Sequence, residues 1–140
     1  MKFRIPPAAL AVFDTDLRTL ALFRVLLGSV LLWTLCARFC DVSAFWSDDG
    51  VLPRAALIPL LGPWRWSLHA GSGLAAAQAL LLLVQAALAL MFILGWRTRQ
   101  VALLSWVLLV SLHNRNPLVL TPGDPLLAGF LFWSLFLPLG

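Results

Sequence analysis

The sequence predicts an all-α protein, a polytopic transmembrane helical bundle with about four hydrophobic helical segments plus an interfacial loop or short helix. Composition is the first reason: 61% of the 140 residues are hydrophobic, 11% are charged, and the mean hydropathy is +0.94. A soluble domain has about 25% charged residues. The second reason is the alternation of apolar runs, several near the roughly 20 residues that cross a bilayer, with short stretches containing Gly, Pro and Arg.

The basic residues are distributed as membrane topology requires. The net charge of +4 comes from ten Lys and Arg residues and six Asp residues. These cations lie at the ends of apolar runs, not on one polar face as in a nucleic-acid-binding protein. We therefore expect the lipid bilayer as a partner and no nucleic acid.

Few side chains are available for acid–base chemistry. The chain has no Glu, and Lys2 is its only Lys. Cys36 and Cys40 lie four residues apart in an apolar stretch and are expected to be buried thiols. Residues 48–50, Asp-Asp-Gly, favour a turn. Because no set of His, Cys and Asp has the spacing of a metal site, we predict no metal, and the catalytic residues stay unknown.

The first predicted span covers residues 17–39, with Asp14 or Thr15 as its N-cap and Asp16 near the positive helix end. Arg24 lies inside this span, and an Arg at that depth faces protein or water rather than lipid. Two interpretations are open: Arg24 is a binding residue that pairs with an Asp or a polar head group, or it satisfies helix ends inside the bundle.

Residues 40–72 form a long connection that we expect at the membrane surface. Its tryptophans, Trp46, Trp64 and Trp66, are of the type that favours the membrane interface. Residues 55–61 are predicted to form a short interfacial helix. A loop of this length in a compact bundle is often functional.

The second predicted span runs from Ser72, a candidate cap, to about Trp96. Its polar interior residues, Gln78 and Gln85, are seven apart and therefore lie near one face. Gly95 is expected to end the helix.

The third apolar run, residues 101–112, reaches only about 18 Å at helical rise, which is too short to span. Extending it from Arg99 to Arg115 gives about 17 residues, the lower limit for a span. This extension draws His113 and Asn114 toward membrane depth, and Pro117 should end the helix.

The last segment, residues 125–137, has Asp124 as its predicted N-cap and Pro125 as its first helical residue.

The run His113-Asn114-Arg115-Asn116 has two interpretations. It can form the polar rim of a cavity, where the amides and the guanidinium bind an anionic or carbonyl-bearing ligand and His113 titrates near neutral pH. It can also be an ordinary helix C-terminus, where His and Arg face the negative helix end and Asn adopts a left-handed conformation.

The Lys and Arg residues also predict an orientation. One side of the membrane would hold Lys2, Arg4, Arg18, Arg97 and Arg99, and the other Arg38, Arg54, Arg65 and Arg115. The tight basic turn around Arg97 and Arg99 favours the first side as cytoplasmic. The long connection and the His113–Asn116 run then share the outer side.

Five stretches, in order, resemble one known family. They are "DTDLRTLALFRVLLG" (14–28), "DVSAFWSDDGVLPR" (41–54), "WSLHAGSG" (66–73), "LGWRTR" (94–99) and "LSWVLLVSLHNRNPLVLTPGD" (104–124). Together they resemble the HTTM domain, the membrane domain of bacterial relatives of vitamin K-dependent gamma-carboxylase. The run "SLHNRNP" and the terminal "LPLG" are the most specific parts.

The resemblance implies a multi-helix membrane domain with a cytoplasmic N-terminus, in a bacterial cytoplasmic membrane, and chemistry on the outer side. The eukaryotic carboxylase uses reduced vitamin K, oxygen and carbon dioxide to convert Glu to gamma-carboxyglutamate, with an active-site Lys as base. In the family that Lys follows the segment matching residues 126–140. We therefore expect residues 1–140 to be one membrane domain, the N-terminal portion of a larger HTTM domain.

On this basis the parent protein would bind a quinone and a peptide substrate. Six residues would contribute to binding in this chain: Arg24, His113, Asn114, Arg115, Asn116 and Asp124. The alternative is a non-catalytic membrane protein that binds a lipid or isoprenoid in the same cavity or acts as a scaffold.

Overall fold

The computed structural model describes residues 17–60, 62 and 65–139, and every regular element in these ranges is helical. The elements are α2 (Leu17–Cys40), α3 (Val42–Phe45), α4 (Arg54–Leu57), η1 (Ile58–Leu60), η2 (His69–Gly71), α5 (Ala75–Leu94), α6 (Thr98–Arg115), η3 (Pro117–Val119) and α7 (Gly123–Ser134). The predicted all-α class is confirmed. The predicted caps Asp14, Thr15 and Asp16 lie outside the described residues.

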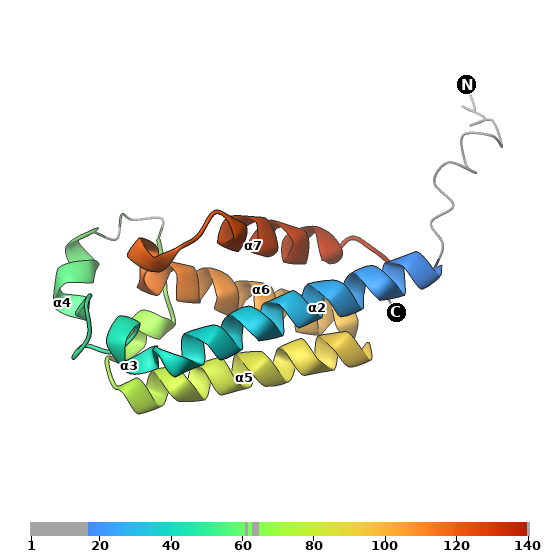
Figure 1. The fold of residues 1–140 in the computed structure, drawn as a ribbon. Coiled ribbons are helices and arrows are strands. Elements are labelled where there is room, and N and C mark those ends of the chain that lie inside the picture. The colour runs from blue at the N-terminus through green and yellow to red at the C-terminus, as the bar shows by residue number, and fades with distance from the viewer. Residues whose placement is uncertain (1–16, 61, 63–64, 140) are drawn as a thin grey trace, which may run out of the picture.

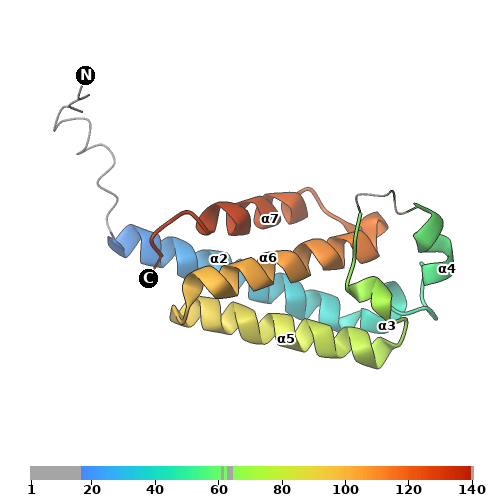
Figure 2. The same ribbon diagram turned by 180° about the vertical axis from the view of Figure 1, so that it is seen from behind.

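The four long helices lie side by side, as Figure 1 shows. α2 packs along α5, α5 along α6, and α6 along α7, whereas α2 and α7 touch much less. We call this loosely closed side the α2–α7 seam. The short helices gather at one end of the bundle, the loop end. At the opposite end, the turn end, residues 95–97 join α5 to α6, as the reverse view in Figure 2 shows.

Two of the helices, α2 and α5, are long and apolar enough to cross a membrane. α6 has 18 residues but carries Arg99 and Arg115. α7 has 12 residues, about 18 Å of helix against a hydrocarbon core of about 30 Å. Membrane association is thus supported by two helices, and the bundle of four spanning segments stays a prediction.

Helix ends follow local chemistry in most places. Gly95 ends α5 with φ +82°, in the left-handed region that suits glycine, and this prediction is confirmed. The predicted extension of the third segment is also confirmed, because α6 continues to Arg115 and stops before Pro117. Ser72 is not the cap of α5: the helix begins at Ala75, and the Ser72 hydroxyl accepts a hydrogen bond from the Leu74 N–H.

Burial corrects two further predictions. Cys36 and Cys40 are exposed, because the buried residues of α2 recur at the three- and four-residue spacing of another face, at Leu27, Leu31 and Leu35.

The tryptophans of the long connection differ from one another. Trp66 is exposed, as expected of an interfacial residue, whereas Trp46 is buried in the core. Trp64 lies outside the described residues. The predicted interfacial helix over residues 55–61 corresponds to α4 and η1, with residue 61 outside the described part.

The close packing of α2 on α5 depends on the small size of Gly28. A Cβ at this buried position would lie 2.5 Å from Ile93 Cγ1 and 3.3 Å from Phe92 Cδ1. A side chain here would therefore force Ile93 or the spacing of the two helices to shift.

We predict that Gly28→Ala is less stable than Gly129→Ala by about 1–3 kcal/mol, the usual cost of overpacking. Both substitutions gain the same helix propensity, and a Cβ at Gly129 meets nothing within 4 Å. Thermal unfolding in detergent micelles measures the difference. Equal stability of the two variants would contradict the tight α2–α5 contact.

Candidate functional site

The amides at the end of α6 bind the backbone of the long connection. Asn114 Nδ2 donates to the Trp66 carbonyl over 2.8 Å, and Asn116 Nδ2 donates to the Phe45 carbonyl over 2.7 Å. Asn116 also accepts the Leu118 N–H and so caps η3. These contacts connect α6 to two distant parts of the connection.

Arg115 serves the same connection from a fully buried position. Its Nη1 donates to the Leu52 carbonyl over 2.8 Å, and its Nη2 lies 3.3 Å from Asp48 Oδ1. Asp48 also accepts the Arg54 backbone N–H at 3.0 Å and Arg54 Nε at 2.7 Å. The hydrogen bond from the Arg54 backbone, together with the guanidinium charges of Arg54 and Arg115, holds the pKa of Asp48 below its usual value.

The predicted Asp48-Asp49-Gly50 turn is present, but one of its carboxylates has a larger role. Asp48 joins Arg54 of the connection to Arg115 of α6. Since an unpaired buried guanidinium is costly, this carboxylate and the Leu52 carbonyl explain why Arg115 can be buried.

His69 forms a second buried link between the connection and α6. Its Nδ1 lies 2.8 Å from Ser111 Oγ, and its backbone N–H donates to the same oxygen over 3.1 Å. Because that oxygen already accepts the backbone N–H, the Ser111 proton is available to Nδ1. Burial, and secondarily the Arg115 guanidinium, lowers the pKa of His69 to about 4. His69 is therefore neutral at pH 7.

Asp124 lies in the first turn of α7 rather than at its N-cap, which corrects the prediction. Its Oδ2 accepts the Thr121 N–H at 2.8 Å, an arrangement that satisfies a donor just before the helix. Its Oδ1 pairs with the Arg38 guanidinium of α2. His113 Nε2 lies 3.8 Å from the same oxygen and has no hydrogen-bond partner within the described chain.

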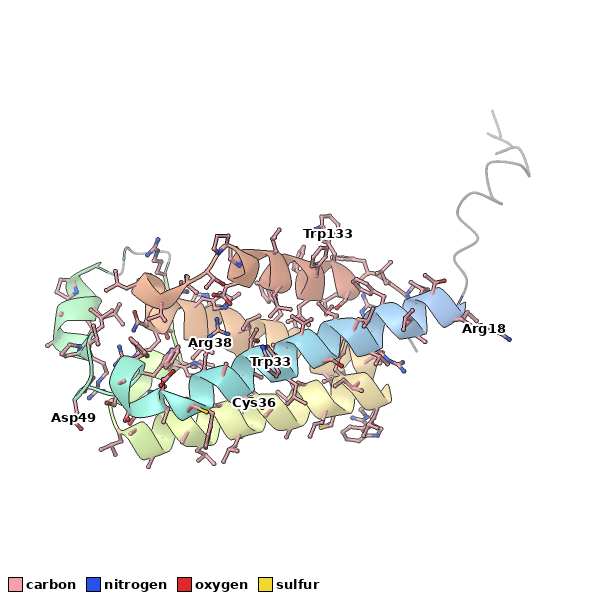
Figure 3. All side chains as sticks on the ribbon, in the orientation of Figure 1. Arg18, Trp33, Cys36, Arg38, Asp49 and Trp133 are labelled. Carbon is pink, nitrogen blue, oxygen red and sulfur yellow. The ribbon has the colours of Figure 1, made fainter. Side chains whose placement is uncertain are left out.

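A groove of about 250 Å³ opens beside the Arg38–Asp124 pair, and we call it the loop-end groove. Figure 3 shows Arg38 extending from α2 toward the start of α7. Two lining residues have a buried donor without a partner in the described part of the molecule: Trp46 Nε1 and Arg38 Nη1. The groove is lined by Trp33, Thr34, Ala37, Arg38, Asp41, Phe45, Trp46, Val119, Thr121 and Asp124.

A second groove of about 240 Å³ continues along the same seam, and we call it the apolar groove. Its lining is almost entirely aliphatic and aromatic: Phe23, Leu26, Leu27, Val30, Gly123, Leu126, Leu127 and Phe130. Val30 and Thr34 are one turn apart on α2, and Gly123 and Asp124 are adjacent on α7, so the two grooves lie next to each other along the seam. The seam thus presents a hollow with several polar side chains at the loop end and a wholly apolar one next to it.

The six predicted binding residues are divided by the structure. Asp124 lines the loop-end groove, and His113 lies beside the Asp124 carboxylate without lining the groove. Asn114, Arg115 and Asn116 do not line it either and bind the long connection instead. Arg24 lies far away: its Nη1 donates to the Leu139 carbonyl at the turn end. Fourteen residues separate Arg24 from Arg38, about 21 Å along a helix.

Several groove residues were missed by sequence reasoning. Arg38 was assigned only to the outer side, and Thr34, Asp41 and Thr121 were not singled out. One signal was available: Arg24 and Arg38 differ by only about 40° around an α-helix, so both face the same neighbour.

Within the described residues, no group of three or more His, Cys, Asp or Glu side chains is arranged to hold a metal ion. No family model, curated protein or solved structure matches the chain. These comparisons therefore carry no information on the HTTM resemblance.

We predict that Asp124→Asn destabilises the protein by on the order of 3 kcal/mol, because it leaves the Arg38 charge without its carboxylate. Adding Arg38→Met should recover much of the loss, since the uncompensated charge is then gone. Asp49→Asn at an exposed turn is the control and should change little. Chemical unfolding in micelles measures all four proteins, and a neutral Asp124→Asn would refute the pairing.

We also predict a pH dependence from His69. Its folded pKa of about 4 is below the ordinary 6.5, so the unfolded chain takes up the proton first. The contribution of neutral His69 to the free energy of unfolding is fully present above pH 6.5. It falls by about 3 kcal/mol as the pH decreases toward 4. His69→Asn should lose less stability than the wild type between pH 7 and 4.5. If the free energy of unfolding depends on pH in the same way in the wild type and in His69→Asn, the lowered pKa of His69 is contradicted.

Proposed function

We propose that this chain is part of an integral membrane protein that binds an amphipathic ligand along the α2–α7 seam. The observation that carries the proposal is that the two grooves follow one another along the same pair of helices, α2 and α7. A polar head beside Arg38 and Asp124 and an apolar tail in the groove lined by Val30 and Leu126 would each meet side chains of matching polarity. Such a pocket, mostly apolar with a few polar groups at one end, is typical of small-molecule sites.

The charges at the loop-end groove favour a neutral head group. Its lining holds one guanidinium, from Arg38, and two carboxylates, from Asp41 and Asp124. An anionic head would meet a surplus of negative charge. A quinone carbonyl could instead accept from Trp46 Nε1 or Arg38 Nη1 after a side-chain movement that uncovers these buried, unpartnered donors. A hydroquinone hydroxyl can donate to Asp41.

We infer from the HTTM resemblance that the ligand is reduced vitamin K or another isoprenoid quinone. In that case the full-length parent is a quinone-dependent carboxylase of peptide Glu residues, and this chain supplies the seam that holds the quinone. The catalytic base would come from a part of the parent beyond these 140 residues, because Lys2 is the only Lys here.

The second candidate is a non-catalytic lipid- or isoprenoid-binding protein or scaffold. One observation favours it: Asp124 already binds Arg38 and Thr121, so this carboxylate is poorly placed to remove a proton from a ligand. Both candidates predict the same ligand binding along the seam. Only catalytic turnover by the full-length parent distinguishes the carboxylase from the non-catalytic protein.

The proposed membrane placement follows the sequence. α2 and α5 cross the bilayer, α6 and α7 complete the bundle beside them, and the loop end lies on the outer side of a bacterial cytoplasmic membrane. The N-terminus is then cytoplasmic. The support is the apolar length of α2 and α5 and the basic turn that contains Arg97 and Arg99.

We predict that Ala37→Phe, which fills the loop-end groove without removing a polar group, weakens phylloquinone binding at least tenfold. Ala87→Phe, at an exposed position of α5, is the matched control and should bind as the wild type does. The rise in unfolding temperature on titration with phylloquinone in micelles measures affinity. Menadione, which lacks the tail, should bind more weakly than phylloquinone.

Equal binding by Ala37→Phe and Ala87→Phe would contradict the assignment of the seam. The carboxylase hypothesis has its own test in the full-length parent, supplied with vitamin K hydroquinone, bicarbonate and a Glu-containing peptide. Formation of the epoxide and carboxylated peptide would support it. Quinone binding without either product would favour the non-catalytic candidate.

A further inference from the structure

Among the residues that the structure describes, the turn end of the bundle has an excess of positive charge. Arg97 and Arg99 are both exposed there. Within the described residues neither pairs with a carboxylate. Arg97 makes only a long contact to the Gln100 side chain at 3.4 Å and stacks on Trp96, with 5.6 Å from the guanidinium carbon to the ring centroid. Their donors are therefore available to an external anion.

Two hollows meet at these arginines. One, of about 390 Å³, lies between the first turn of α6 and residues 135–139. The other, of about 410 Å³, is formed by residues 97–100. Thr98 and Arg99 line both. Both hollows are open to the exterior, so a phosphate group can reach the guanidinium of Arg99.

Arg24 maintains one wall of the first hollow. Its Nη1 donates to the Leu139 carbonyl, which connects the chain after α7 to α2. The guanidinium also lies so close to Gly95 that a Cβ there would be 2.6 Å from Nη1. Arg24 thus has a positioning role and places a third positive charge at the same end.

Exposed aromatic side chains surround the arginines. Trp96 is 57% exposed and Phe136 is 64% exposed, and Phe136 lines the first hollow beside Leu135 and Leu137. Tryptophan and Arg side chains together are typical of the depth at which lipid head groups lie. The hollows thus offer guanidinium donors next to apolar surface.

We propose that the turn end binds the head group of an anionic phospholipid, with Arg99 as the central phosphate ligand and Arg97 beside it. The planar guanidinium of Arg99 matches two phosphate oxygens. The acyl chains would lie against Phe136 and Leu137. This site is at the opposite end of the bundle from the loop-end groove and has the opposite charge, so neither proposal depends on the other.

The test uses the whole chain in micelles and dioctanoyl phosphatidylglycerol as the probe, with affinity read from native mass spectrometry and thermal shift. Phosphatidylglycerol should bind at least tenfold more tightly than dioctanoyl phosphatidylcholine. Arg99→Gln should weaken it about fivefold, the usual effect of one basic residue near a membrane surface. Arg65→Gln, at an exposed position of the long connection, is the control and should change nothing.

Arg99→Lys keeps the positive charge but loses the planar guanidinium. Its affinity for phosphatidylglycerol should lie between those of the wild type and Arg99→Gln. Equal affinity for the two lipids, or equal losses in Arg99→Gln and Arg65→Gln, would overturn the proposal. Stabilisation by glycerol phosphate or inorganic phosphate equal to that by phosphatidylglycerol would also overturn it, because the site would then bind a free anion rather than a lipid.

Discussion

The structure depends on two guanidinium groups that extend from one side of α2 across an otherwise loosely packed seam. Arg38 binds Asp124 at the start of α7, and Arg24 binds the Leu139 carbonyl beyond its end. Between them the helices touch mainly through apolar side chains, such as the edge-to-face pair Phe23 and Phe130, with ring centroids 6.3 Å apart. A seam connected at both ends and open between them leaves a groove without separating the helices.

The two ends of the bundle consequently differ in chemistry. At the loop end each buried cation has a carboxylate partner: Arg38 with Asp124, and Arg115 with Asp48. The carboxylates outnumber the guanidinium groups around the adjacent groove, which favours a neutral, hydrogen-bonding head group. At the turn end Arg97 and Arg99 have no such partner among the described residues, which favours an anion. The two polar regions, one suited to a neutral head group and one to an anion, therefore lie at opposite ends of α2.

Local rules were sufficient to predict much of the fold. Gly95 and Pro117 act through their own backbone geometry, and the length expected of a membrane span predicted that α6 would extend to Arg115. The site could not be predicted in the same way, because its main pair joins residues 86 positions apart and depends on how α2 packs beside α7. Asn114, Arg115 and Asn116 bind carbonyl oxygens of the connection, and a sequence does not reveal which carbonyls approach which amides.

The most direct test of this account is the distance between α2 and α7 at the loop end. Spin labels on the native Cys36 and on Pro125→Cys, with Cys40→Ser, report it by pulsed electron resonance. We expect a narrow distribution that broadens and moves to longer distances in Arg38→Gln and stays unchanged in Arg54→Gln. If Arg38→Gln leaves the distribution unchanged, the Arg38–Asp124 pair does not hold α2 and α7 together at the loop end.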